Sequence, residues 1–287
     1  MAMGAEGTSP NVSATCTDVS IESSGRVVAS VVLDDGEGYY SFISNHDDMG
    51  DARSILYEFE GFATSIVLAS DGSVNVVDTD GNVHSDRTGS WQLTSITQAR
   101  LSWLNEVDGT LVACGAQGGT FRLLGGTWQP LVGPSKLEFF GLDGDHIDDL
   151  YIVGRRGTAA RIDHGTWFEL ALPTNADLLS VHAAAAGDVL IGGKRGTLLR
   201  GASAQWQAID IDDLSVYAIT TFNGKIYIGC ADRGLWRLKN GSVELVRDDV
   251  PAFRLASAGN YLAVGGRNKL WRFDGQRWED RTYRHGG

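Results

Sequence analysis

Residues 150–170 read LYIVGRRGTAARIDHGTWFEL, and two later stretches repeat the same pattern. Residues 189–209 read VLIGGKRGTLLRGASAQWQAI, and residues 261–281 read YLAVGGRNKLWRFDGQRWEDR. In all three, an apolar run ends in glycine, a short basic turn follows, and an arginine precedes a tryptophan by six residues. Repeats at a fixed period decide the fold class of a chain, so this pattern is followed along the whole sequence.

The tryptophans give the register of the repeat. A turn residue stands nineteen residues before each position of the series: Gly72 before Trp91, Gly109 before Trp128, Asp148 before Trp167, Gly187 before Trp206, Gly224 before Val243 and Gly259 before Trp278. Each unit reads as four short strands separated by turns, for example LLSVHAA, VLIGG, TLLRG and WQAID in residues 178–210. Four strands in about 40 residues is typical of a β-propeller blade.

The sequence therefore predicts an all-β fold, a seven-bladed β-propeller of four-stranded antiparallel blades. Six regular blades follow residue 61, and the N-terminal stretch supplies a divergent seventh. The alternative is six blades with an N-terminal extension. One domain is predicted over residues 11–283, after a disordered N-terminus (1–10) and before a C-terminal tail (284–287).

The repeat, of the form aliphatic–VG–x–x–GT–x–x–R–x–x–G–x–x–W, resembles that of bacterial propellers similar to photosystem II assembly factors and to BNR-like and WD-repeat-like proteins. The resemblance covers about residues 61–283 and implies a scaffold, assembly or binding factor. The Asp-box of sialidases and the GH and WD dipeptides of true WD repeats are absent. The arginine found in five units (Arg122, Arg161, Arg200, Arg237 and Arg272) is expected to pack or pair against a neighbouring blade.

Composition narrows the function classes. The 37 glycines suit many tight turns. A net charge of −12 argues against nucleic acid as the partner. No apolar run approaches the ~18 residues of a membrane span, and no signal peptide is evident, so a cytoplasmic monomer is expected. The six histidines show no paired zinc spacing, and no GxSxG elbow or phosphate loop occurs, so the chain is predicted not to be an enzyme.

Basic residues gather in the links between the second and third strands of four successive units. They are Arg155, Arg156, Lys194, Arg195, Arg233, Arg267 and Lys269. These links share a face with the links between blades, so the residues are predicted to form a partner-binding rim that holds carboxylates or phosphates. The competing interpretations are solvated turn residues, or pairing with acids of the adjoining links: Asp210, Asp212, Asp213, Asp248 and Asp249.

Two further groups of polar residues stand out. Ser102, Glu138, Ser180 and Ser215 begin inner strands and are expected to line the central channel. The segment FGLDGDHIDDLYIVG resembles a calcium loop, in which Asp143, Asp145 and Asp149 would be the ligands, although Gly141 stands where the first aspartate belongs. Calcium is the one cofactor the sequence suggests.

Together these features favour a non-catalytic scaffold that holds another protein on one face. The specific hypothesis is a bacterial immunity protein that neutralises a toxin, motivated by the small size, the acidic charge and the missing catalytic motifs. The alternatives are a lectin-like or small-ligand propeller and, third, a propeller hydrolase or lyase.

Overall fold

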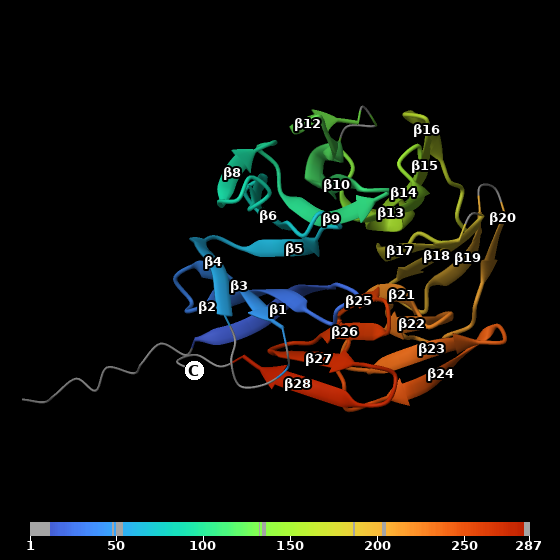
Figure 1. The fold of residues 1–287 in the computed structure, drawn as a ribbon. Helices are drawn as coiled ribbons and strands as arrows, with labels where there is room; N and C mark the ends of the chain where they lie inside the picture. Colours follow the sequence, from blue (N-terminus) through green and yellow to red (C-terminus); the bar gives the residue numbers. More distant parts are fainter. Residues whose placement is uncertain are drawn as a thin grey trace, which may run out of the picture.

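The computed structural model describes residues 12–47, 49, 54–131, 133, 136–185, 187–202 and 205–283. Twenty-eight strands form seven four-stranded antiparallel sheets, which are arranged as blades around a central axis (Figure 1). The seven-bladed prediction is confirmed, and the six-bladed alternative is wrong because residues 13–60 form a complete blade of their own. The predicted termini, residues 1–10 and 284–287, lie outside the described residues.

The strands follow one another around the ring. Blade 1 contains β1 (Ser13–Ile21), β2 (Val27–Asp34), β3 (Tyr39–His46) and β4 (Ser54–Glu60). Blade 2 contains β5 (Ala63–Leu68), β6 (Val74–Asp78), β7 (Asn82–Ser85) and β8 (Gln92–Ser95). Blade 3 contains β9 (Leu101–Val107), β10 (Thr110–Gly115), β11 (Thr120–Leu124) and β12 (Thr127–Pro130). Blade 4 contains β13 (Phe139–His146), β14 (Asp149–Gly154), β15 (Ala159–Asp163) and β16 (Thr166–Glu169).

The last three blades complete the ring. Blade 5 contains β17 (Leu178–Ala185), β18 (Asp188–Gly193), β19 (Leu198–Ala202) and β20 (Gln205–Ala208). Blade 6 contains β21 (Ala218–Phe222), β22 (Lys225–Gly229), β23 (Leu235–Lys239) and β24 (Ser242–Arg247). Blade 7 contains β25 (Arg254–Ala258), β26 (Tyr261–Gly265), β27 (Lys269–Phe273) and β28 (Trp278–Thr282). The helical structure described is two short 3₁₀ turns, η1 (Ala116–Gly118) and η2 (Arg155–Gly157), so none of it is long enough to cross a membrane.

The apolar residues form seven separate cores, and each core lies between two adjacent blades. This explains why strands such as β14 are buried on both faces, because neither side of a blade meets water. The repeated tryptophan is partly buried at the outer part of these cores. Trp167, for example, packs in the core between blades 3 and 4, with its ring 5.8 Å from that of Phe139. Val243 takes the same place between blades 5 and 6.

The glycine of the Gly-Thr pair is required by the backbone. Gly157 and Gly196 have φ of +74° and +69°, where residues with a Cβ are strained. A Cβ there would also lie 2.4 Å from the carbonyl oxygen of Thr174 and 2.1 Å from that of Asp212, both in the link to the next blade. The turn between second and third strands therefore lies directly against the link between blades.

The repeated arginine pairs mainly within its own blade, so the expectation of a neighbouring blade is corrected. Arg161 donates two hydrogen bonds to Asp149, at 2.6 and 3.0 Å, and Arg200 bonds Asp188 at 2.7 and 2.6 Å. The acid stands at the start of the adjacent second strand, which places both partners on the same side of one sheet. Their position across adjacent strands is why the bond stays inside the blade.

The ring closes between blades 7 and 1 without an exchanged strand, because every sheet consists of consecutive strands. Tyr283, which follows β28, is 1% exposed and packs in the core shared by blades 7 and 1. Its hydroxyl lies 3.0 Å from both Ser44 Oγ and His46 Nε2 of blade 1. Arg272 of blade 7 also donates a bond of 2.7 Å to the carbonyl oxygen of Gly25. Side-chain contacts thus hold the closing interface.

Candidate functional site

Antiparallel strands place the loops of each blade on alternate faces of the ring. Face A carries the links between blades and the links between second and third strands. Face B carries the other two links of each blade. All seven predicted rim residues lie on face A, in blades 4 to 7, as the alignment of the repeats indicated. The structure therefore brings them to one face, and their surroundings decide what they can do there.

Five of the seven predicted cations are already paired with acids. The contacts are Arg155 to Glu138 at 3.1 Å, Lys194 to Asp177 at 3.0 Å, Arg233 to Asp213 at 3.7 Å, Arg267 to Asp232 at 2.8 Å and Lys269 to Asp280 at 2.8 Å. Of the acids considered from the sequence, Asp213 alone takes part in these five contacts. The rim is therefore a lattice of alternating charges rather than a basic patch.

The pairing shows in the titration of the acids. Hydrogen bonds from the Arg156 N–H and from Lys194 hold the pKa of Asp177 below its ordinary value. The two bonds from Arg267 likewise lower the pKa of Asp232. These acids are therefore ionised at neutral pH, and they neutralise much of the positive charge that the sequence suggested.

Arg156 and Arg195 are the exceptions. Both are exposed, and neither guanidinium has an acidic partner among the residues that the structure describes. They occupy the same turn position in adjacent blades, with φ of +56° and +58°, a conformation uncommon for residues other than glycine. Gln117 of blade 3 has the same conformation, so the turn belongs to the blade type. In blades 4 and 5, the residue at the tip of this turn is a free arginine, whereas in blade 3 it is Gln117.

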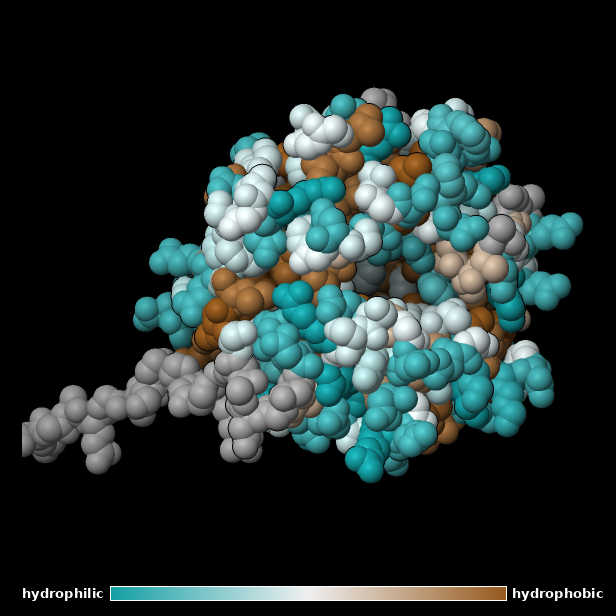
Figure 2. Space-filling view, in the orientation of Figure 1, coloured by the Kyte–Doolittle hydropathy of each residue, from teal (hydrophilic) through white to brown (hydrophobic). Residues whose placement is uncertain are grey.

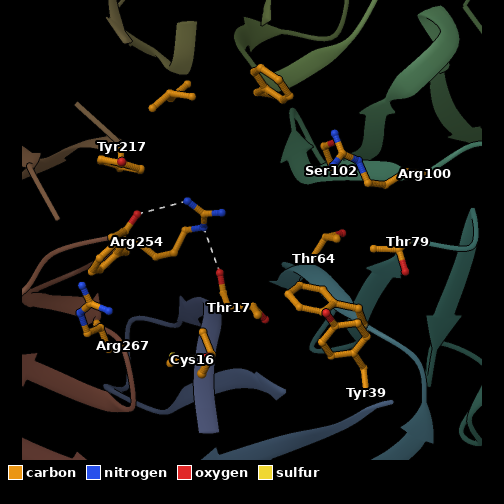
Figure 3. A pocket seen from close by; sticks show the side chains of 16 residues that line it. Cys16, Thr17, Tyr39, Thr64, Thr79, Arg100, Ser102, Tyr217, Arg254 and Arg267 are labelled. Atoms are coloured by element: carbon orange, nitrogen blue, oxygen red, sulfur yellow. Dashed lines mark hydrogen bonds between the residues drawn. The ribbon is translucent and has the colours of Figure 1, made fainter. Parts of the chain in front are cut away.

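A cavity of about 710 Å³ opens on face A at the mouth of the central channel. Figure 2 shows a mostly hydrophilic surface that is hollowed near the middle of the ring. Each blade contributes at least one residue from its inner strand or from the position just before that strand, and these include Thr17, Thr64, Ser102, Phe140, Leu179, Tyr217 and Arg254. Tyr39, Phe62 and Phe253 add aromatic surface, and several of these side chains face one open space in Figure 3.

In blades 1 to 5, a β-bulge in the inner strand orients the residue that lines the cavity. The pairing of first and second strands skips one residue in each: Thr17, Thr64, Ser102, Phe140 and Leu179. A bulge leaves its extra residue unpaired and redirects the side chain, and such bulges are common beside binding sites. The same irregularity, repeated in five blades, directs one side chain per blade into the cavity.

Most of the residues expected from the sequence to line the channel do not line this cavity, and the bulge in blade 5 explains the case of Ser180. Ser102 does line the cavity, but Glu138 instead bonds Arg100 and Arg155. Ser180 is 6% exposed, and its neighbour Leu179 lines the cavity in its place. In blade 6, where β21 and β22 pair without a bulge, Tyr217 lines the cavity and Ser215 does not. One skipped residue turns every following side chain to the other face of the strand, and the sequence does not reveal the skip.

Arg254 lines the cavity and is a candidate site residue that the sequence analysis missed. Its Nε donates to the carbonyl oxygen of Thr17 at 3.0 Å, and its Nη1 donates to that of Phe253 at 3.2 Å. The nearest carboxylate is Asp18, at 3.8 Å. Burial raises the pKa of Asp18, while Arg254 and the bonds from Ser65 and Ile66 oppose that rise. The available signal was a position that recurs every 37 to 39 residues from Thr64 to Arg254.

Deeper in the channel, polar side chains of successive inner strands bond one another. Asn105 Nδ2 lies 2.9 Å from Asp143 Oδ1, and Asp143 Oδ2 lies 3.3 Å from His182 Nδ1. His182 Nε2 is 2.8 Å from Thr221 Oγ1, and Ser257 donates to the Thr221 carbonyl at 2.7 Å. This chain joins blades 3 to 7 and serves to fix them around the axis.

The proposed calcium ligands do not gather around one point. Asp143 is engaged by Asn105 and His182, and Asp149 is held by both arms of Arg161. No group of three or more potential metal ligands occurs within the described ranges. The geometry gives the calcium prediction no support, and it plays no part in the function proposed below.

Comparison with known proteins places the fold. No protein-family model matches the sequence, and no curated protein matches it significantly. The WD40 β-propeller domain of Doa1 superposes with a TM-score of 0.73, at 14% identity, covering 90% of this chain and 91% of that one. A chain of the mitotic checkpoint complex gives 0.68, at 15% identity, covering 93% and 92%. Sqt1 of Saccharomyces cerevisiae gives 0.64, at 16% identity, covering 95% and 85%.

These likenesses support the predicted WD-repeat-like propeller. At such low identity they establish the fold alone. The resemblance to BNR-like proteins and photosystem II assembly factors, and the bacterial origin, stay predictions.

Proposed function

We propose that this propeller is a non-catalytic scaffold that binds another protein on face A, over the rim of blades 4 to 7. The observation that carries the proposal is the pair of free guanidinium groups, Arg156 and Arg195, on adjacent blades. Arginine is enriched where proteins bind one another, because its planar fork matches carboxylate groups. The surrounding lattice of paired charges gives such an interface a polar rim of defined pattern.

The rigidity of the face supports the proposal. The turns that carry the two arginines lie against the links between blades, where Gly157 and Gly196 leave no room for a Cβ. A pre-organised surface loses little conformational entropy on binding, which leaves more of the contact energy for affinity. The structurally similar propellers include a chain of an assembled complex, the mitotic checkpoint complex.

The finer form of the proposal is that the partner is a basic toxin and that this chain is its immunity protein. Its support is the net charge of −12, which would speed the encounter with a basic protein. The free arginines would then contact acidic side chains at the centre of the interface, while the overall charge steers the approach.

The test is affinity capture from the source cell with two variants matched in charge. The first, Arg156→Glu with Arg195→Glu, reverses both free cations of face A. The second, Lys225→Glu with Arg277→Glu, makes the same change in net charge at two exposed positions of face B. We expect the wild type and the face B variant to retain one partner in equal amounts, and the face A variant to lose it.

Equal capture by both variants would remove the rim from the interface, and equal loss would show that net charge alone mattered. The toxin form is tested by co-expressing the captured partner with and without this chain. Growth that depends on the chain supports it, and growth without the chain refutes it.

A further inference from the structure

The cavity at the channel mouth contains three arginines, but two of them are satisfied by acids. Arg100 bonds Glu138, and Arg267 makes a two-pronged contact with Asp232, at 2.8 and 2.5 Å. Arg254 differs, because its hydrogen bonds go to main-chain carbonyl oxygens. A carbonyl satisfies a donor without neutralising the charge, and the one carboxylate beside Arg254 in the described chain, that of Asp18, makes an ion pair at 3.8 Å but no hydrogen bond with it.

Asp18 does not take up the remaining donors of Arg254. Its carboxylate already accepts bonds from the Ser65 hydroxyl at 2.7 Å and from the main-chain N–H groups of Ile66 and Val19 at 3.0 and 2.9 Å. It also stands 3.8 Å from Nε of Arg254, an ion-pair distance without a hydrogen bond. In the described part of the chain no partner is found for Nη2, and Figure 3 shows it facing the open space.

The guanidinium is also held in place before any ligand arrives. Two of its three nitrogens are fixed by Thr17 and Phe253, and its centre lies 5.8 Å from the ring of Trp103 in blade 3. A side chain so restrained loses little freedom on binding, so a new charge-assisted hydrogen bond adds affinity at small entropic cost.

The other residues of the cavity wall indicate what kind of chemical group an anion bound to Arg254 would carry. Tyr39 and Phe62 meet edge to face at 5.1 Å on one side, and Tyr217 and Phe253 meet at 5.5 Å on another. Such rings favour an aromatic or apolar group. One cation with one free nitrogen suits a singly charged carboxylate better than a phosphate, which needs several donors.

We propose that this cavity binds a carboxylate carried beside an aromatic or apolar group, with Arg254 as the anchor. The carboxylate can belong to an acidic residue on a protein segment or to a free organic acid, because both present the same chemistry. The site lies at the channel mouth and needs neither Arg156 nor Arg195, so it goes beyond the proposed protein-binding rim.

The test is an NMR titration of the whole chain with two matched pairs of probes. One pair is phenylacetate and phenylacetamide, and the other is N-acetyl-Phe-Asp-amide and N-acetyl-Phe-Asn-amide. We expect each acid to bind the wild type about tenfold or more tightly than its amide, as a bond to a charged group predicts. Arg254→Gln should abolish that difference, and Arg277→Gln on face B should leave it unchanged.

A second variant keeps the test decisive if Arg254→Gln does not fold. Leu179→Trp fills the cavity from blade 5 and leaves residue 254 unchanged, so both acids should lose binding. Equal affinity of acid and amide for the wild type would overturn the proposal, as would unchanged acid binding by Arg254→Gln or Leu179→Trp. Tighter binding of the dipeptide identifies a protein segment as the source, and tighter binding of phenylacetate identifies a free acid. None of these outcomes bears on the capture experiment, whose variants lie outside the cavity.

Discussion

Removing the side chain of Tyr283 should weaken the ring more than any change at the exposed edge of a blade. The residue is 1% exposed and joins blade 7 to blade 1 where no strand is shared. A buried tyrosine removes about 150–250 Å² from water, which at about 25 cal/mol per Å² corresponds to about 4–6 kcal/mol as an upper bound. Measured losses for aromatic residues replaced by alanine are about 3–5 kcal/mol, so we expect this range for Tyr283→Ala.

The hydroxyl group should account for a small part of that loss. Ser44 and His46 lie 3.2 Å apart and can still bond each other when the tyrosine oxygen is absent. Tyr283→Phe should therefore cost about 1 kcal/mol. Phe168→Ala on the outer strand β16, where the ring is 51% exposed, is the control and should cost less than about 1 kcal/mol.

The assay is unfolding in guanidinium chloride, followed by the fluorescence of the eight tryptophans. Hydrogen exchange of β1 and β28 would show whether opening begins between blades 7 and 1. A loss of less than about 1 kcal/mol for Tyr283→Ala, or equal losses for Tyr283→Ala and Phe168→Ala, would refute the view that this side chain closes the ring.

Two further predictions concern a turn and a buried carboxylate. Gly196→Ala should destabilise the fold more than Gly165→Ala in the same unfolding assay, because both have positive φ but only Gly196 has a carbonyl oxygen where the Cβ would stand. Gly165→Ala should cost about 1 kcal/mol, and equal losses would show that the close approach to Asp212 is unimportant. Burial raises the pKa of Asp78, but the bonds from His84 and Asn82 outweigh it and hold the pKa below the ordinary 3.8. The ionised carboxylate therefore stabilises the fold above pH 3.8, and this stabilisation is lost as the pH falls further. The free energy of unfolding that Asp78→Asn loses relative to the wild type should be largest near neutral pH and should shrink below pH 3.8. A deficit that stays constant with pH would contradict the assignment.

The amino-acid sequence by itself indicated four-stranded blades, favoured seven of them over six, and located the repeated turns of the six regular units. Trp167 and its equivalents recur because each blade has to bury an indole against the blade before it, and Gly157 and Gly196 recur because the turn backbone excludes a Cβ. These requirements arise within one blade or between neighbouring blades, so the same residue types recur at the same positions of the repeats. The same pattern correctly assigned the basic residues to face A.

The tertiary structure alone decided what faces the channel and which charges are free. Because of the bulge at Leu179, this residue lines the cavity and Ser180 does not. A bulge is hard to predict from the sequence when the strands are buried on both faces, because the apolar pattern then does not show which way each side chain points. Arg155 and Lys194 are paired while Arg156 is free, because Glu138 and Asp177 reach the rim from links of variable length. Arg254 reaches the cavity because the closed ring brings blade 7 against blade 1. Contacts of this kind depend on distances across the ring, which local sequence patterns do not encode.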